Sequence, residues 1–247
     1  MTGVQTCALP ISRQHNIKII QQKLQVLYLE NLPRWEYRYL KNALIRDETV
    51  LANTWLYSAD KDFPQDKSKL ATSISGFPAK SELFKYHCII LGDVSPQSLG
   101  EDNMKLLVEF VKEVGGGVIF IAGNNYNPVE YWDTPLATLL PVLLENIPSE
   151  ESRNELQRLQ LTPEGREHPI MRIESDPEEN KRMWNSRQGL PGFYWYFPVH
   201  KAKPGATVLA THEENNKMIM ATQFYGKGKT FFTDRKSTRL NSSHGKL

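Results

Sequence analysis

The clearest pattern in the sequence covers residues 99–125, where apolar residues at helical spacing give way to a short, continuous apolar run. Three consecutive glycines, Gly115 to Gly117, separate the two patterns, and glycine accepts the left-handed conformation that commonly ends a helix. The run Val118–Ile121 is typical of a strand buried on both faces of a parallel sheet. The helical stripe before the glycines consists of Leu106, Leu107, Phe110, Val111 and Val114.

Helix and strand patterns alternate through the whole first half of the chain. The order β-α-β-loop-β-α-β predicts a parallel sheet with helices on both faces, which is an α/β fold. Residues 34–46 form the first expected helix, and the polar stretch 58–81 is expected to be a long surface loop. The strands are expected at residues 24–30, 50–57, 86–93 and 118–121.

The second half has closely spaced strand patterns joined by short loops. Such spacing favours hairpins, so antiparallel strands should extend the edge of the parallel sheet. A helix is expected over residues 176–187, with Asp176 as its N-cap, and an aromatic strand over residues 193–199. The closely spaced strands are expected at residues 206–211, 217–225 and 229–233.

Both ends of the chain differ from the rest. Residues 1–12 and 234–247 resemble peptides translated from sequencing-library adapters, and we exclude them from the fold as foreign tails. Residues 13–23 are then expected to be the end of a preceding domain or a linker. The domain itself covers residues 24–233 and is expected to be truncated at its C-terminal end.

Removing the tails changes the charge balance. The full chain has a formal charge of +2, whereas the remainder has 26 basic and 27 acidic residues, a charge of −1. This balance gives no electrostatic reason to expect nucleic acid as a partner. No apolar run reaches the ~20 residues of a membrane-spanning helix, so we expect a soluble domain that does not itself insert into a membrane. Cys88 lies in an apolar strand, where we expect it to pack in the core.

Six segments together resemble a glutamine-amidotransferase-like domain of the class I superfamily, which occurs in large bacterial membrane proteins, often beside a von Willebrand factor A domain. The resemblance implies a flavodoxin-like fold and a parent protein anchored in the bacterial cell membrane, on a side that stays open. The most specific parts are the PRWEYR sequence and the strand after the three glycines. The segments are residues 27–44, 83–94, 110–123, 161–170, 195–210 and 223–232.

The catalytic residues of that superfamily are not in place. A class I amidotransferase needs a cysteine at a strand-to-helix elbow, activated by a histidine that a glutamate orients. The elbow position corresponds to Ala122, and Tyr225 and Lys227 stand where the His-x-Glu pair would fall. We therefore predict no glutaminase triad and no glutaminase activity. The scattered histidines lack the short spacing of a zinc site, so no metal and no cofactor is predicted.

Several polar residues are expected at the carboxyl edge of the sheet, where α/β proteins bind ligands. Asp93 is either a turn residue or a ligand-binding carboxylate. Arg34 and Arg38 either bind an anion at the helix N-terminus or form an ion pair with Glu36 over a packed Trp35. The candidate ligand or partner surface is Arg34, Trp35, Glu36, Arg38, Asp93, Asn124 and Asn125.

Two functional hypotheses follow. The first is a non-catalytic module with a recognition or assembly role, whose partners are other domains of the parent chain or other proteins. The alternative is a small-ligand binder or hydrolytic enzyme that uses Asp93, Arg34, Glu36 and Asn124 at the same edge. The trehalose-utilisation-like proteins, which share the fold and a similar YGKGK hairpin, suggest a sugar-related ligand for this alternative.

Overall fold

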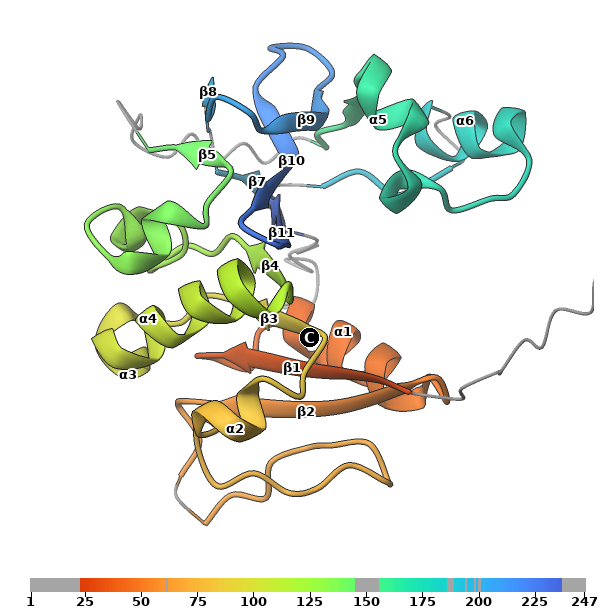
Figure 1. Ribbon diagram of the computed structural model, residues 1–247. Coiled ribbons are helices and arrows are strands. Elements are labelled where there is room, and N and C mark those ends of the chain that lie inside the picture. Colours follow the sequence, from red (N-terminus) through yellow and green to blue (C-terminus); the bar gives the residue numbers. More distant parts are fainter. Residues whose placement is uncertain are drawn as a thin grey trace, which may run out of the picture.

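The computed structural model describes residues 23–236 except 61, 145–155, 186–188, 194, 198 and 200. The expected tail 1–12, residues 13–22 of the expected linker 13–23 and residues 237–247 of the expected tail 234–247 lie outside the described residues. Within the described part, eight strands form one sheet in the order β2-β1-β3-β4-β11-β10-β9-β6 (Figure 1). These strands are β1 (Leu24–Glu30), β2 (Val50–Leu56), β3 (Cys88–Leu91), β4 (Gly117–Ile121), β6 (Leu159–Leu161), β9 (Thr207–His212), β10 (Met218–Tyr225) and β11 (Gly228–Thr233).

The first five strands of this order are parallel, and the last three alternate in direction. The order β2-β1-β3-β4-β11 is the 2-1-3-4-5 order of flavodoxin-like folds. The prediction of a mostly parallel α/β sheet with antiparallel strands added by the C-terminal part is therefore confirmed. Two further strand pairs lie outside this sheet. They are β5 (Val142–Leu143) with β8 (Lys201–Ala202), and β7 (Trp195–Tyr196) with β12 (Arg235–Lys236).

Helices and single turns connect the strands. The segment expected as one helix before the glycines is an α-helix followed by a π-helical turn, which ends at Gly115 with φ of 88°. The turn allows the buried Phe110 ring to lie against Gly116, where a Cβ atom would overlap that ring. The α-helices are α1 (Trp35–Arg46), α2 (Lys80–Leu83), α3 (Pro96–Leu99), α4 (Glu101–Glu109), α5 (Pro163–Glu167) and α6 (Pro177–Asn185). The other turns are π-helical η1 (Phe110–Val114) and 3-10 helical η2 (Val129–Tyr131), η3 (Pro135–Thr138) and η4 (Pro169–Met171).

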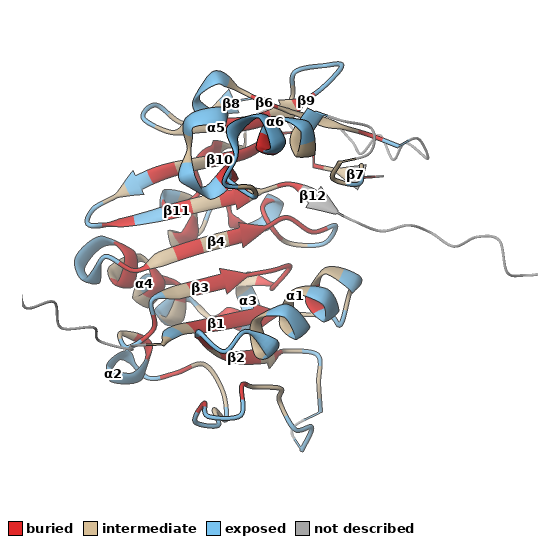
Figure 2. Ribbon diagram, turned by 90° about the vertical axis from the view of Figure 1, so that its right-hand side faces the viewer, coloured by how far each residue is buried: buried red, intermediate tan, exposed pale blue. Residues whose placement is uncertain are grey.

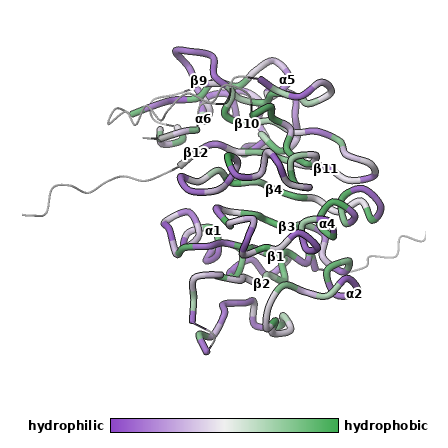
Figure 3. Tube along the Cα trace, turned by 90° about the vertical axis from the view of Figure 1, so that its left-hand side faces the viewer, coloured by the Kyte–Doolittle hydropathy of each residue, from purple (hydrophilic) through white to green (hydrophobic). Residues whose placement is uncertain are grey.

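Helices cover both faces of the sheet because alternate side chains of each strand point to opposite faces. In β1, Val26 and Tyr28 pack with α1 on one face, whereas Leu27 and Leu29 join the large core beneath α4 and η1. On the α1 face, a separate cluster lies under α5 and α6 at the antiparallel end (Figure 2). The apolar residues of the central strands run through the middle of the molecule (Figure 3).

Some predicted boundaries shift by a few residues. The strand expected at 86–93 is shorter, Cys88–Leu91, because Gly92 and Asp93 already turn away at the edge. The predicted N-cap Asp176 precedes helix α6, and its Oδ1 accepts a hydrogen bond from the Glu179 N–H group at 2.8 Å. Asp234, placed with the foreign tail by the sequence, is buried, and its amide donates to Ile219 O at 2.9 Å. No helix among the described residues is both long enough and apolar enough to span a membrane.

Candidate functional site

Glu30 is the central residue of the carboxyl edge. It ends β1, is fully buried, and both carboxylate oxygens are occupied. Oε1 accepts from the N–H groups of Asn31 at 3.1 Å and Asp93 at 2.8 Å. Oε2 accepts from Arg34 Nε at 2.9 Å and from the Tyr28 hydroxyl at 3.3 Å. A carboxylate accepts about four hydrogen bonds, so Glu30 has no oxygen position left for a ligand.

Arg34 joins β1 to β4 across the edge of the sheet. It stands just before α1, where its Nε pairs with Glu30. Its Nη1 donates to Ala122 O at 2.9 Å and its Nη2 to Ile121 O at 3.4 Å. Burial is the largest single influence on the pKa of Arg34 and lowers it, but the surrounding acidic groups, Glu30 foremost and then Tyr28 and Asp93, together outweigh burial and raise the pKa. Burial also raises the pKa of Glu30, against the opposing effect of Arg34. The guanidinium therefore stays charged and acts as a clamp.

Asp93 is saturated in the same way by the loop that follows β4. Its Oδ1 accepts from the N–H groups of Tyr126 at 2.8 Å and Asn127 at 3.0 Å. Its Oδ2 accepts from the Asn125 N–H at 3.1 Å and from Asn125 Nδ2 at 3.0 Å. Gly123 permits this approach, since a Cβ atom there would overlap the Asp93 carboxylate. The turn-residue interpretation of Asp93 thus describes its contacts better than the ligand-binding one.

Asn127 holds the same loop from inside, and the sequence pattern did not identify it. It is fully buried, and its Nδ2 lies within hydrogen-bond distance of the carbonyls of Leu91 at 3.1 Å, Gly92 at 3.0 Å and Ile121 at 3.1 Å. The signal that could have found Asn127 is its place in the turn just after a buried strand. Glu30 had a clearer signal, because an acid ends an otherwise apolar strand four residues before an arginine.

Ala122 lies at the carboxyl end of β4, buried beneath Arg34, and its N–H donates to Thr233 O at 2.9 Å. A methyl side chain has no nucleophilic atom. Tyr225 and Lys227 lie in the β10–β11 hairpin, at the opposite end of β4, because β11 pairs with β4 from Lys229 opposite Gly117. The structure therefore does not bring Tyr225 and Lys227 to the elbow, and they do not occupy the position of a His-x-Glu pair.

The remaining candidates lie on the surface beside this network. Trp35 and Tyr39 of α1 have exposed fractions of 46% and 66%, and their rings stack with centroids 5.9 Å apart. The Arg38 guanidinium lies 5.0 Å from the Trp35 ring. We call Trp35, Arg38 and Tyr39 the α1 aromatic surface. Of the two alternatives for this segment, the ion pair over a packed Trp35 does not describe Trp35, which is exposed, and Arg34 forms its ion pair with Glu30. Glu36 is half-buried, and Asn124 and Asn125 are exposed.

Cys88, at the start of β3, contributes to the core on the α1 face, as expected. Burial raises the pKa of its thiol to about 11. A thiol of this kind is almost wholly protonated at neutral pH and is a poor nucleophile. The described residues contain no group of three or more His, Cys, Asp or Glu side chains placed to hold a metal ion.

The network lies at the topological switch point of the sheet. In flavodoxin-like folds the chain leaves β1 and β3 toward opposite sides, and ligands bind outside the carboxyl ends of these two strands. Here Glu30 is the last residue of β1 and Asp93 comes just after β3, so the two saturated carboxylates occupy that position. The arrangement can lock three strand ends together. It presents no carboxylate oxygen free to act as a base or to coordinate a cation.

Comparison with solved structures gives likeness in fold. A cytoplasmic protein of Salmonella typhimurium matches with a TM-score of 0.59 and 18% identity, over 89% of this chain and 91% of that one. A second cytoplasmic protein, from S. typhimurium LT2, matches with a TM-score of 0.60 and 17% identity over the same shares. A ThuA-like protein of Bacteroides uniformis has a TM-score of 0.49 and 11% identity, over 90% and 86%. No protein-family model and no curated protein sequence matches the chain.

Proposed function

We propose that this chain is a non-catalytic recognition module on a glutamine-amidotransferase-like α/β fold. The observation that carries the proposal is the saturation of Glu30 and Asp93 at the switch point, where each carboxylate accepts four hydrogen bonds from the chain itself. A general base or a metal ligand needs a free lone pair, and a nucleophile would have to replace Ala122. The alternative of a binder or hydrolase that uses Asp93 and Arg34 would have to break this network first.

The α1 aromatic surface supports the recognition role. Tryptophan, tyrosine and arginine are the residues most enriched in the energetic centres of protein interfaces. Here one of each is gathered on the solvent side of α1, and Leu32, 47% exposed, precedes them. An exposed stacked pair keeps few rotamers, so little side-chain entropy remains to be lost on binding. The proposed occupant is a protein surface, specifically another domain of the same parent chain.

The proposed parent is a larger bacterial protein associated with the membrane. This part rests on the sequence resemblance, whose most specific segment, PRWEYR, covers Arg34, Trp35, Glu36 and Arg38. Arg34 of this segment has a structural role, whereas Trp35 and Arg38 point outward. One short sequence thus combines the clamp of the sheet edge with the proposed contact surface.

The first experiment separates catalysis from recognition. The purified chain is incubated with glutamine and ammonia is measured; we expect no release above the buffer. Glutamine hydrolysis that disappears on one substitution in the described chain would refute the non-catalytic role.

The second experiment identifies the partner. Long sequencing reads through the parent gene give the neighbouring domains, which are expressed separately and titrated against the wild-type chain and the Trp35→Ala/Tyr39→Ala variant. We expect binding to one domain and a loss of at least about 10-fold in the variant, as hot-spot residues give. The control is Lys69→Ala, on the exposed loop after β2. Equal binding by all three proteins, or a gene that encodes no further domain, would contradict the proposed partner.

A further inference from the structure

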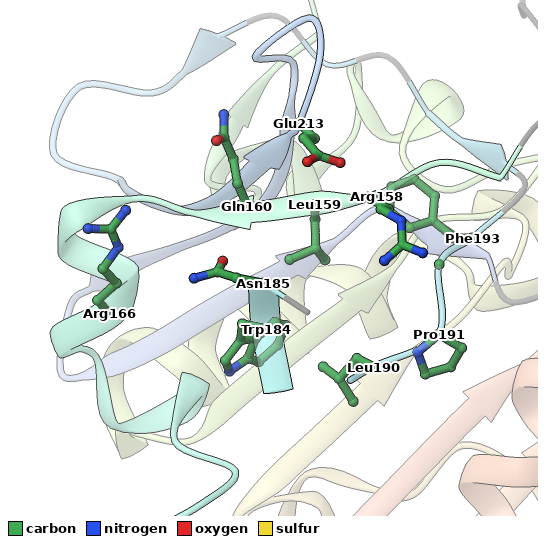
Figure 4. Close-up of a pocket in the computed structure, with 11 residues that line it drawn as sticks. Arg158, Leu159, Gln160, Arg166, Trp184, Asn185, Leu190, Pro191, Phe193 and Glu213 are labelled. Atoms are coloured by element: carbon green, nitrogen blue, oxygen red, sulfur yellow. The ribbon is translucent and has the colours of Figure 1, made fainter. Parts of the chain in front are cut away.

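A pocket at the antiparallel end of the molecule differs in chemistry from the switch point. Its volume is about 310 Å³. It lies between the start of β6, the end of helix α6 and the turn that joins β9 to β10 (Figure 4). This volume is at the lower end of the range for small-molecule sites. The side chains that matter for its chemistry are Arg158, Gln160, Arg166, Trp184, Asn185 and Glu213.

The walls of the pocket are fixed by hydrogen bonds. Trp184 Nε1 donates to Met171 O at 2.7 Å, which sets the orientation of the indole ring. Gln157 and Phe193 exchange both backbone hydrogen bonds, at 2.7 and 2.9 Å, and thereby anchor the loop that closes one side. Gly192 in that loop lies so close that a Cβ atom would overlap Gln157 O. A ligand would therefore meet a wall that is already in place, which reduces the entropy lost on binding.

The pocket has an excess of positive charge. Arg158 and Arg166 stand on opposite sides of Leu159 and Asn185 (Figure 4), and Glu213 is the one acidic side chain among the described residues of the lining. In the part of the chain that the structure describes, neither guanidinium takes part in an ion pair or a side-chain hydrogen bond. Their planar donor groups match carboxylate and phosphate oxygens.

We propose that this pocket binds a small organic oxyanion, a carboxylate or phosphate ester on a compact, hydroxyl-bearing body. The arginines bind the charged group, the amide of Asn185 binds a hydroxyl group, and the indole of Trp184 packs against the apolar side of the body. Gln160 Nε2 donates to Asn216 Oδ1 at 3.0 Å, so its Oε1 is the atom that accepts from a ligand hydroxyl. The inference is independent of the recognition role of α1, since the two regions share no residue.

The test is calorimetric titration of the full chain with three matched compounds. D-glucuronate carries a carboxylate, glucose 6-phosphate carries a phosphate ester, and glucose carries neither on the same ring. We expect at least one of the two anions to bind at least about 10-fold more tightly than glucose, because charge-assisted hydrogen bonds are the stronger ones. Preferential binding of one anion shows whether the pocket takes a carboxylate or a phosphate ester. Absence of binding by both anions, or equal binding of glucose, would overturn the proposal.

Variants locate the binding. Arg158→Gln and Arg166→Gln are each expected to weaken anion binding about 10-fold, whereas Arg158→Lys keeps the charge and should lose less. The matched control is Arg172→Gln, an exposed arginine nearby that does not line the pocket. Arg166 and Arg172 are exposed, so their variants should fold, and thermal melting verifies folding for all four. Binding that survives both glutamine variants unchanged, or that falls equally in Arg172→Gln, excludes this pocket as the site.

Discussion

The two polar regions of the molecule differ in whether their charged side chains are paired. At the switch point, Glu30, Arg34 and Asp93 direct their charged groups at one another and at backbone atoms, and little remains for a ligand. In the pocket beside α6, the guanidinium groups of Arg158 and Arg166 form no ion pair and no side-chain hydrogen bond with the described residues. The comparison shows that the chain's own hydrogen bonds can occupy the position where this fold usually binds ligands, while unpaired charged groups lie in another part of the described residues.

The largest expected effect comes from breaking the clamp. Arg34→Met leaves the Glu30 carboxylate buried without its partner, and removal of one member of a buried pair destabilises a protein by about 3–5 kcal/mol. Urea unfolding measures the change. Arg166→Met is the matched control, because this guanidinium is exposed and has no ion pair with the described residues, and it should change the free energy of unfolding by about 0.5 kcal/mol or less. Similar losses in the two variants would remove the contrast between the regions.

The second prediction concerns the pH dependence of Cys88 alkylation, and it tests whether solvent and reagents reach the core of the parallel half. In a Cys7→Ser variant, Cys88 is the only thiol left. Its pKa rises from 9.0 to about 11. Only the thiolate reacts, so alkylation near neutral pH should be about 100-fold slower than for an ordinary thiol, and the rate should keep rising as the pH approaches 11. Timed alkylation with mass spectrometry measures it. In denaturant the rate should return to the ordinary value; a fast rate in the folded protein would show that Cys88 is accessible.

The third prediction concerns Asn127. Asn127→Ala removes the amide that faces three carbonyl groups at the ends of β3 and β4. A buried acceptor left without a partner costs about 1–3 kcal/mol, and we expect a loss of unfolding free energy in that range. Asn124→Ala, on the exposed part of the same loop, should be nearly neutral. If the two variants lose equal stability, Asn127 does not hold the loop.

Apart from the control variants, the smallest loss of stability is expected on the α1 aromatic surface. Trp35→Ala/Tyr39→Ala removes an exposed stacked pair, and we expect a loss of about 1 kcal/mol or less in the isolated chain. This near-neutrality is what makes the variant useful for binding experiments. A loss as large as that of Arg34→Met would indicate that these rings support the fold.

The strands and helices of the first half could be predicted because continuous apolar runs and helical stripes are local signals. The contacts of Glu30 could not be predicted, because the Asp93 N–H group that donates to its carboxylate is 63 residues away in the sequence. They also depend on Gly92, where a Cβ atom would overlap the Glu30 carboxylate. Of the predicted site residues, Arg34, Asp93 and Asn125 do come together, through Glu30 or directly. The pocket gave no signal, because Arg158, Trp184 and Glu213 come from separate segments whose meeting depends on the antiparallel half.

The position of β11 has a consequence for how the protein forms on the ribosome. It is the fifth parallel strand, yet it comes from the end of the described chain, and about 100 residues separate it from its neighbour β4. Until those residues have been synthesised, β4 remains an open edge with apolar side chains, and such edges promote association between nascent chains. Contacts so distant in sequence also slow folding. The parallel half of the sheet can therefore be completed only after the strands β9 and β10 of the antiparallel half have been synthesised.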